Sequence, residues 1–322
     1  MLLLAVAAAL WLVPSDDYIF LPDHAKAVAP LVHVQGEKPD RGSGGIYLVD
    51  VLVRRANLLE RIVPGIRDGS TLVPESAIEP PGVSQSEREQ ADLQAMTRSQ
   101  DIGAAVALKE LQYPVRAVPT GVLVDAVFPG MPAVGKLRQG DVITAVDGTR
   151  VRGPEQLRRR LTPVKPGETV DLTVRNGKDL RRESIRTTSE REQPDRALIG
   201  IGIEQAATID LPVRITIDTG DIGGPSAGLA FALDVMEELG RDVDRGYKVA
   251  ATGELSLDGK VHPVGGLKQK TIGARNSHVD VLLAPAGENA AIARHYAGNV
   301  TVVSVHTLHQ ALHKLATLPR HR

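Results

Sequence analysis

The sequence predicts a multidomain chain of mixed α and β structure, combining α+β and α/β segments. Three observations support this prediction: an apolar run opens the chain, a β-rich segment occupies its middle, and strand and helix patterns mix in its last third. By length alone, 322 residues suffice for about two domains. We therefore expect an anchor helix followed by folded domains, the last of which layers helices on a sheet.

The opening segment, Met1 to Val13, contains only apolar residues and ends at Pro14. A full membrane span needs about 20 such residues, and no basic residue precedes the run as in a signal peptide. We expect residues 1–22 to be a membrane anchor, a truncated transmembrane helix, with a buried core helix as the alternative. The charges do not give its orientation, because the first basic residue is Lys26.

Residues 28–112 carry strand patterns and then a long helix pattern. The segment Gly45 to Val53 is rich in aliphatic residues, as strands are. A helix is expected from Ser84 or Ser86 to Leu111, because each serine has a glutamate three residues later and fits a capping box. We expect these N-terminal elements to pack with the last domain.

Composition excludes several classes of function. The net charge of −1 and the 3% aromatic content give no basis for binding nucleic acid. The absence of cysteine excludes disulfides, thiol nucleophiles and cysteine-ligated metals. The remaining candidates are sites built from hydroxyl, amine, imidazole and carboxylate groups.

Residues 113–188 form a separate unit. A strand pattern begins at Gly121, the segment Gly140-Asp-Val-Ile leads to Val146-Asp-Gly148, a helix pattern covers Pro154 to Leu161, and two strands meet at Asn176-Gly177. This order resembles a PDZ domain of the bacterial protease-associated type, β-rich with two helices. Such domains bind extended peptides by strand addition.

The PDZ resemblance implies a peptide groove between the strand from Val122 and the helix that carries Leu157. Main-chain amides around Thr120, Gly121, Val122 and Leu123 would receive a chain-terminal carboxylate, so the expected partners are proteins or peptides. A competing motif, Gly130 to Lys136, matches the start of a phosphate-binding loop, but Leu137 stands where magnesium needs Ser or Thr. We therefore expect no nucleotide.

Ser226 stands in Gly224-Pro-Ser-Ala-Gly228, on a tight turn before an apolar helix pattern. At a helix N-terminus the free backbone N–H groups and the dipole favour an oxyanion, as a nucleophilic serine needs. Serine also commonly caps helices at this position. This stretch alone leaves both interpretations open.

A nucleophilic serine needs a base. The string Gly-x-Ser-x-Gly occurs in α/β-hydrolases, but the proline before Ser226 and the loop before it fit their strand-to-helix turn poorly. A lysine is the other candidate: Lys268 and Lys270 point to different helix faces, and a buried amine has a lowered pKa. Both lysines could also lie on the surface. Histidines that follow the serine keep a histidine base open: His262, His278, His295, His306, His309 and His313.

Three motifs in order resemble the proteolytic domain of Lon proteases: Gly224-Pro-Ser-Ala-Gly228, Thr252-Gly-Glu254, and Pro263-Val-Gly-Gly-Leu-Lys-Gln-Lys270. The resemblance covers residues 196–318. It implies a serine endopeptidase with Ser226 as nucleophile and Lys270 as base, without a cofactor. The sequence has no intact P-loop and too few residues for an ATPase module, so we expect the activity to be ATP-independent. Thr252 would orient the lysine, and Gly224 and Pro225 would shape the turn.

With the apolar N-terminus and the PDZ unit, the chain resembles membrane-anchored Lon-like proteases of Gram-positive bacteria. The resemblance implies a single-pass protein of the cell membrane, an extracytoplasmic catalytic part and a homo-oligomer. Lon proteases usually carry Lys-Asp before Gly-Pro-Ser, whereas Ile222-Gly223 stands here, and the nearest acid is Asp221. The PDZ unit would be an insertion in the protease domain.

Two weaker alternatives complete the set. His306, His309 and His313 lie on one predicted helix face, but they lack a further ligand, so we expect no metal site. The chain could also be a PDZ-based adaptor on an inactive Lon-like scaffold. The presence of both Ser226 and Lys270 favours the enzyme.

Overall fold

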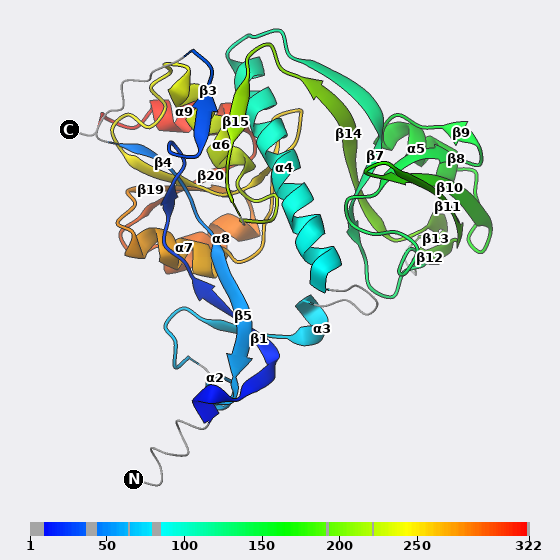
Figure 1. The fold of residues 1–322 in the computed structure, drawn as a ribbon, viewed down its shortest axis with the longest axis horizontal. Coiled ribbons are helices and arrows are strands. Elements are labelled where there is room, and N and C mark those ends of the chain that lie inside the picture. Colours follow the sequence, from blue (N-terminus) through cyan, green and yellow to red (C-terminus); the bar gives the residue numbers. More distant parts are fainter. Residues whose placement is uncertain are drawn as a thin grey trace. The chain divides into compact units, whose positions relative to one another are not determined.

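The computed structural model describes residues 10–36, 44–63, 65–78, 85–190, 193–220 and 222–320, without the side chains of Gln85 and Glu87. The chain divides into two compact units (Figure 1). Unit 1 combines Met1–Pro114 with Leu211–Arg322, and unit 2 is Val115–Asp210. Unit 2 is therefore inserted in the sequence of unit 1.

Unit 1 is built on a five-stranded sheet in the order β2-β4-β16-β19-β20. The four strands from β4 to β20 run parallel, and β2 pairs antiparallel at the edge. The central strands are buried on both faces, as a parallel sheet between helices requires. The strands are β2 (Lys26–Ala27), β4 (Gly45–Leu48), β16 (Lys248–Ala251), β19 (Val281–Pro285) and β20 (Thr301–Val305).

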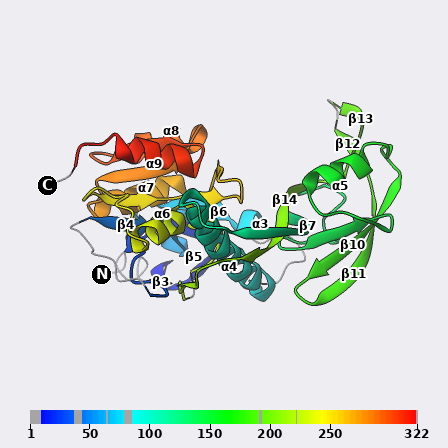
Figure 2. The same ribbon diagram turned by 90° about the horizontal axis from the view of Figure 1, so that it is seen from above.

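Helices cover both faces of this sheet and create two hydrophobic cores. One core contains α6 (Gly228–Glu238), α4 (Gln85–Glu110) and α9 (Leu308–Ala316), and the other contains α7 (Leu267–Asn276) and α8 (Glu288–Tyr296). Figures 1 and 2 show α4 lying along α6. Ten of the eleven residues of α6 are buried, because α4 and the sheet enclose it.

Smaller elements complete unit 1. A three-stranded sheet has the order β5-β1-β6, and two strand pairs, β3 with β15 and β17 with β18, lie outside both sheets. The elements are β1 (Pro14–Pro22), β3 (Val32–Val34), β5 (Val51–Asn57), α2 (Leu58–Ile62), β6 (Thr71–Pro74), α3 (Glu75–Ile78), β15 (Ile215–Ile217), β17 (Glu254–Leu255) and β18 (Val261–His262).

The predicted anchor, residues 1–22, needs correction where the structure describes it. Residues 1–9, like Ser84 and Asp221, lie outside the described residues. Pro14–Pro22 is strand β1, because Tyr18 and Ile19 bury their side chains while β5 and β6 pair along both edges. No helix in the described ranges is both long and apolar enough to cross a bilayer.

Unit 2 contains a sheet in the order β11-β10-β8-β7-β14, with β9 paired to β8, and its own hydrophobic core. The predicted hairpin turn at Asn176-Gly177 is present, with φ of +56° at Gly177. The elements are β7 (Arg116–Val127), β8 (Val142–Val146), β9 (Thr149–Arg150), α5 (Pro154–Leu161), β10 (Thr169–Asn176), β11 (Asp179–Arg186), β12 (Thr188–Glu190), β13 (Gln193–Leu198) and β14 (Ile201–Asp210).

The predicted boundaries of this unit, 113 and 188, differ from those of the structure. Strand β14 pairs antiparallel with β7 from Ile201↔Val127 to Asp210↔Arg116. Residues up to Asp210 therefore belong to unit 2, and the second part of unit 1 begins at Leu211 rather than at residue 196. The mixed α and β content predicted from the sequence is confirmed, but the described residues of unit 2 contain one helix, α5, where two were expected.

Candidate active site

Ser226 lies in the loop that enters α6. Gly224 adopts φ of +89°, a conformation that favours glycine, and Pro225 follows it. The N-cap of α6 is Ala227 and makes no side-chain cap, while the Oγ of Ser226 accepts a hydrogen bond from Lys270. The capping interpretation of Ser226 is therefore wrong, and its hydroxyl belongs to a side-chain cluster.

Helix α4 contacts the loop that carries Ser226 through hydrogen bonds. The N–H of Gly224 donates to the carbonyl of Asp92 at 2.9 Å, and the Oγ of Ser99 donates to the carbonyl of Pro225 at 2.9 Å. A Cβ on Gly228 would lie 3.0 Å from the Ser99 Oγ, so helix and loop are in close contact. Because more than 120 residues separate Ser99 from the loop, no local sequence pattern points to this contact.

Lys270 reaches the serine from α7. Its Nζ donates to the Oγ of Ser226 at 2.8 Å, and Lys270 is only 4% exposed. Lys268 faces elsewhere: its Nζ donates to the carbonyl of Ser70 at 2.7 Å. The two lysines thus occupy different faces of α7, as their spacing predicts, and only Lys270 joins the serine.

Burial changes the acidity of this amine. The loss of hydration lowers the pKa of Lys270 from its ordinary 10.5 to about 8, and the negative charge of Asp50 acts in the opposite direction. A substantial fraction of the amine is neutral at mildly alkaline pH. A neutral amine 2.8 Å from a hydroxyl can accept its proton.

Thr252 connects the two groups from the carboxyl end of β16. Its side chain is fully buried; the Oγ1 donates to the carbonyl of Ser226 at 3.3 Å and accepts from the Lys270 Nζ at 3.4 Å. The N–H of Gly253 donates to the same carbonyl at 2.9 Å. Three elements, α6, β16 and α7, therefore meet at one hydroxyl–amine pair.

Backbone donors remain available beside the serine. Within the described part of the chain, the N–H groups of Ser226 and Ala227 make no hydrogen bond. They lie at the N-terminus of α6, where the helix dipole favours negative charge. Such N–H groups can stabilise an oxyanion formed at Ser226.

The histidines take other positions. The Nε2 of His262 lies 3.1 Å from the Oγ of Ser256, and the Nδ1 of His309 lies 3.0 Å from Glu110. The base position beside Ser226 is occupied by Lys270. The geometry therefore favours lysine over histidine.

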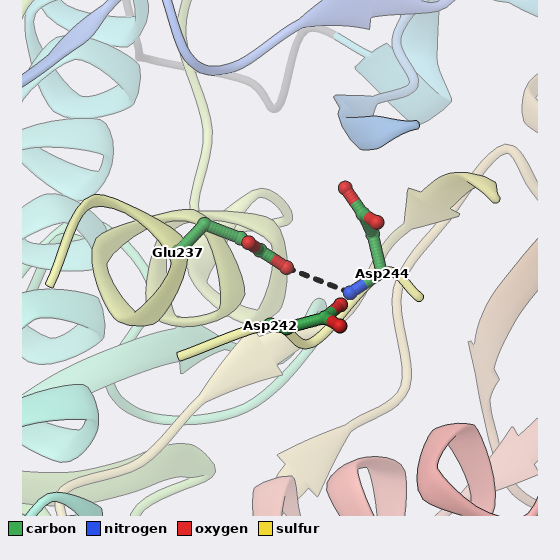
Figure 3. Close-up of side chains that lie close together, drawn as sticks. All are labelled: Glu237, Asp242 and Asp244. Atoms are coloured by element: carbon green, nitrogen blue, oxygen red, sulfur yellow. Dashed lines mark hydrogen bonds between the residues drawn. The ribbon is translucent and has the colours of Figure 1, made fainter. Parts of the chain in front are cut away.

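A group of carboxylates, Glu237, Asp242 and Asp244, lies near the other end of α6 (Figure 3). Glu237 accepts the N–H groups of Val243 and Asp244 at 2.6 and 2.7 Å. Burial, reinforced by the nearby aspartates, raises the pKa of Glu237 to about 7. These hydrogen bonds close the turn after α6, which gives the group a structural role.

The predicted peptide-binding residues of unit 2 do not lie at an open sheet edge. Val122 and Leu123 pair with β14 on one side of β7 and with β8 on the other, Gly121 pairs with β14, and Thr120 lies at a bulge between paired positions. Leu157 is 1% exposed in the core. Because β14 occupies that edge of β7, a peptide cannot add as a strand at Gly121, Val122 and Leu123 as the sequence predicts.

The edge strand of this sheet is β14 itself, among the described residues. A cavity of about 540 Å³ lies where β14 approaches the start of α5. It is lined by Val118, Pro119, Arg150, Arg152, Gly153, Pro154, Glu155, Gln156, Arg159 and Gln205. Among the described residues, the segment Gly130 to Lys136 is followed by turns and strand β8 rather than a helix, and Lys136 donates to the carbonyl of Ser184, so this segment does not have the strand-to-helix form of a phosphate-binding loop.

Comparison with protein families gives two matches. Residues 148–317 match the Lon protease (S16) C-terminal proteolytic domain, and residues 92–186 match the PDZ domain. The second range includes part of α4, and the first includes most of unit 2 after β8. The PDZ match agrees with the strand and helix order of unit 2.

Two Lon proteases are similar in sequence to part of this chain. Lon protease 1 of Bacillus subtilis is 32% identical over 149 residues, which are 46% of this chain and 19% of that protein. Lon protease 2 of Herpetosiphon aurantiacus is 30% identical over 194 residues, 57% of this chain and 22% of that protein. The chain thus spans about a fifth of the length of these relatives. The PDZ domain of the SdrC-like protein from Listeria monocytogenes is 27% identical, covering 26% of this chain and 87% of that one, with a TM-score of 0.25.

Proposed function

This chain belongs to the Lon protease (S16) C-terminal proteolytic domain family, and we propose that it is a serine endopeptidase with Ser226 as nucleophile and Lys270 as general base. The family match supports serine-protease activity. The observation that carries the assignment of residues is the 2.8 Å contact between a buried amine and the Ser226 hydroxyl. This is the geometry that a hydroxyl and its base require.

The geometry supports an acyl-transfer mechanism. Neutral Lys270 takes the proton of the Ser226 hydroxyl while the oxygen attacks the carbonyl carbon of the substrate. The N–H groups beside Ser226 receive the negative charge of the tetrahedral intermediate. The resulting ammonium of Lys270 gives its proton to the leaving amine as the peptide bond breaks. A water molecule, activated by the same amine, then hydrolyses the acyl-enzyme.

Thr252 acts as a positioning residue in this mechanism. Its hydroxyl accepts from Lys270 and donates to the main chain of Ser226, so it keeps the amine directed at the serine. Gly224 and Pro225 fix the turn from which Ser226 projects. None of these steps involves a phosphate, and we propose that hydrolysis of short peptides needs no ATP.

We also propose that unit 2 binds protein segments along β14, as PDZ domains do by strand addition. The cavity beside β14 is lined by Arg150, Arg152 and Arg159, which lie on the surface of unit 2. Their charge suits extended segments that carry acidic side chains. Calorimetric titration with acidic and charge-neutralised peptides, and an Arg152→Glu variant, tests this proposal; equal affinity for both peptides contradicts it.

The test of the proposed activity is hydrolysis of an unfolded protein and of short peptides without nucleotide. Ser226→Ala and Lys270→Ala should each abolish cleavage while the circular dichroism spectrum is retained. Lys268→Ala, a matched change two residues away, should keep activity because its amine faces Ser70. Full activity in Lys270→Ala refutes the assignment, and absence of cleavage in all forms favours the adaptor alternative. We also propose that the chain forms a homo-oligomer, as the family resemblance implies, and light scattering measures its mass in solution.

A further inference from the structure

The ammonium that forms on Lys270 during catalysis is enclosed by protein. Lys270 is 4% exposed, and its amine has two hydrogen-bond partners, the neutral hydroxyls of Ser226 and Thr252. A buried cation without an opposite charge is strongly disfavoured. The mechanism proposed above therefore raises the question of which anion balances the ammonium.

Asp50 comes to this site from the N-terminal part of the chain. Strands β4 and β16 run parallel in the register Leu48↔Ala251. Because the carboxyl ends of neighbouring parallel strands meet at one edge of the sheet, Asp50 follows β4 at the edge where Thr252 follows β16. Thr252 in turn contacts the Lys270 amine.

A second contact ties Asp50 to the helix that carries Lys270. A Cβ on Gly266, the N-cap of α7, would lie 2.6 Å from the side chain of Val51, so Val51 packs directly on that residue. The N–H of Lys270 donates to the carbonyl of Gly266 at 2.9 Å. The Oδ1 of Asp50 accepts the N–H of Val51 at 2.7 Å, so the carboxylate of Asp50 is held by the residue that packs on Gly266.

Among the described residues, Asp50 is the charged group that acts on the pKa of the Lys270 amine. Within the same residues it takes part in no ion pair. The elements packed on α7 direct their groups elsewhere: Asp23, after β1, pairs with Lys26 at 2.9 Å. On α8, the ring of Tyr296 faces Lys268.

We propose that Asp50 is the counter-ion of Lys270, a positioning residue that stabilises the ammonium formed when the amine takes the proton of Ser226. Asp50 is not hydrogen-bonded to the amine, so it acts through its charge. It supplies this negative charge from a part of the chain that is distant in sequence from both Ser226 and Lys270. The proposal rests on the proposed roles of Ser226 and Lys270.

The test removes the charge and keeps the shape. Asp50→Asn should move the pH midpoint of kcat/KM down by about one unit, since a nearby anion favours the charged amine. It should also lower kcat roughly tenfold with little change in KM, because one pKa unit corresponds to a factor of ten. Asp50→Glu should restore both. Asp242→Asn, the same charge change near the other end of α6, should leave the profile of the wild type.

A second measurement separates this inference from the proposed activity. The ¹³Cε resonance of Lys270, identified by its loss in Lys270→Met, reports the titration of the amine whether or not the chain cleaves peptides. Its midpoint should fall in Asp50→Asn and stay in Asp242→Asn. If Asp50→Asn does not fold, Asp50→Ser keeps an acceptor for Val51 and removes the charge. An unchanged midpoint in the folded variant overturns the proposal, even if Lys270 proves essential for cleavage.

Discussion

Replacing Lys270 by methionine should stabilise the protein at neutral pH while abolishing its activity. The structure buries the amine, which lowers its pKa from 10.5 to about 8. This gap corresponds to about 3 kcal/mol that the folded state loses by holding the ammonium at pH 7. Methionine has a similar length and no charge, but it loses the hydrogen bonds to Ser226 and Thr252, worth about 1 kcal/mol. We expect a net gain of about 2 kcal/mol in the free energy of unfolding.

The stability of the wild type should increase with pH as the Lys270 amine loses its proton. Between about pH 8 and 10.5 the unfolded chain binds a proton at this lysine that the folded chain has released. The stability of the wild type therefore rises with pH across this window, and below it the penalty is fully present. The advantage of Lys270→Met should shrink to within about 1 kcal/mol by pH 10.5.

Urea unfolding followed by circular dichroism, at pH 7 and pH 10, measures these differences. Lys268→Met is the matched control, because the Lys268 amine binds the carbonyl of Ser70 at the surface of the same helix. It should show no gain at pH 7. A Lys270→Met protein that is less stable than the wild type at pH 7, or that keeps the same advantage at pH 10, refutes the argument from burial.

Two further changes test the support of the serine. Thr252→Val keeps the shape of a fully buried side chain but loses the hydrogen bond to Lys270, so kcat should fall about tenfold while KM is retained. Thr252→Ser should recover most of the lost kcat. Steady-state kinetics measure both values, and an unchanged kcat in Thr252→Val contradicts the positioning role. Ser99→Ala removes a hydrogen bond to the part-buried carbonyl of Pro225 and should lower the free energy of unfolding by about 1 kcal/mol. Urea unfolding measures this loss, which should be smaller in Ser99→Thr.

The residues of the candidate site that the sequence identified lie in short, ordered motifs. Ser226 ends a glycine-containing loop, in which Gly224 has φ of +89°, Thr252 directly follows strand β16, and Lys270 lies in the first turn of α7 after Gly266. Their meeting depends on elements that are close in sequence, α6, β16 and α7. Local patterns therefore suffice to select them, and the structure brings them together.

The parts that the sequence missed depend on distant pairings. The edge of the unit 2 sheet is β14, which pairs with β7 although about 70 residues lie between the two strands. No local pattern shows that β14 covers Gly121 to Leu123. Asp50 and Ser99 reach the site through β4 and α4, both of which precede unit 2. Each looks like an ordinary polar residue until the sheet order is known.

The proposed activity depends on Lys270 as the base that activates Ser226. The most direct measurement is the rate at which a fluorophosphonate modifies Ser226 between pH 6 and pH 10, followed by intact mass. We expect one adduct, lost in Ser226→Ala, with a rate that rises through a midpoint near pH 8 in the wild type. In Lys270→Met the rate should be at least about a hundredfold lower, as expected for loss of a general base. Equal rates and the same midpoint in Lys270→Met would contradict it.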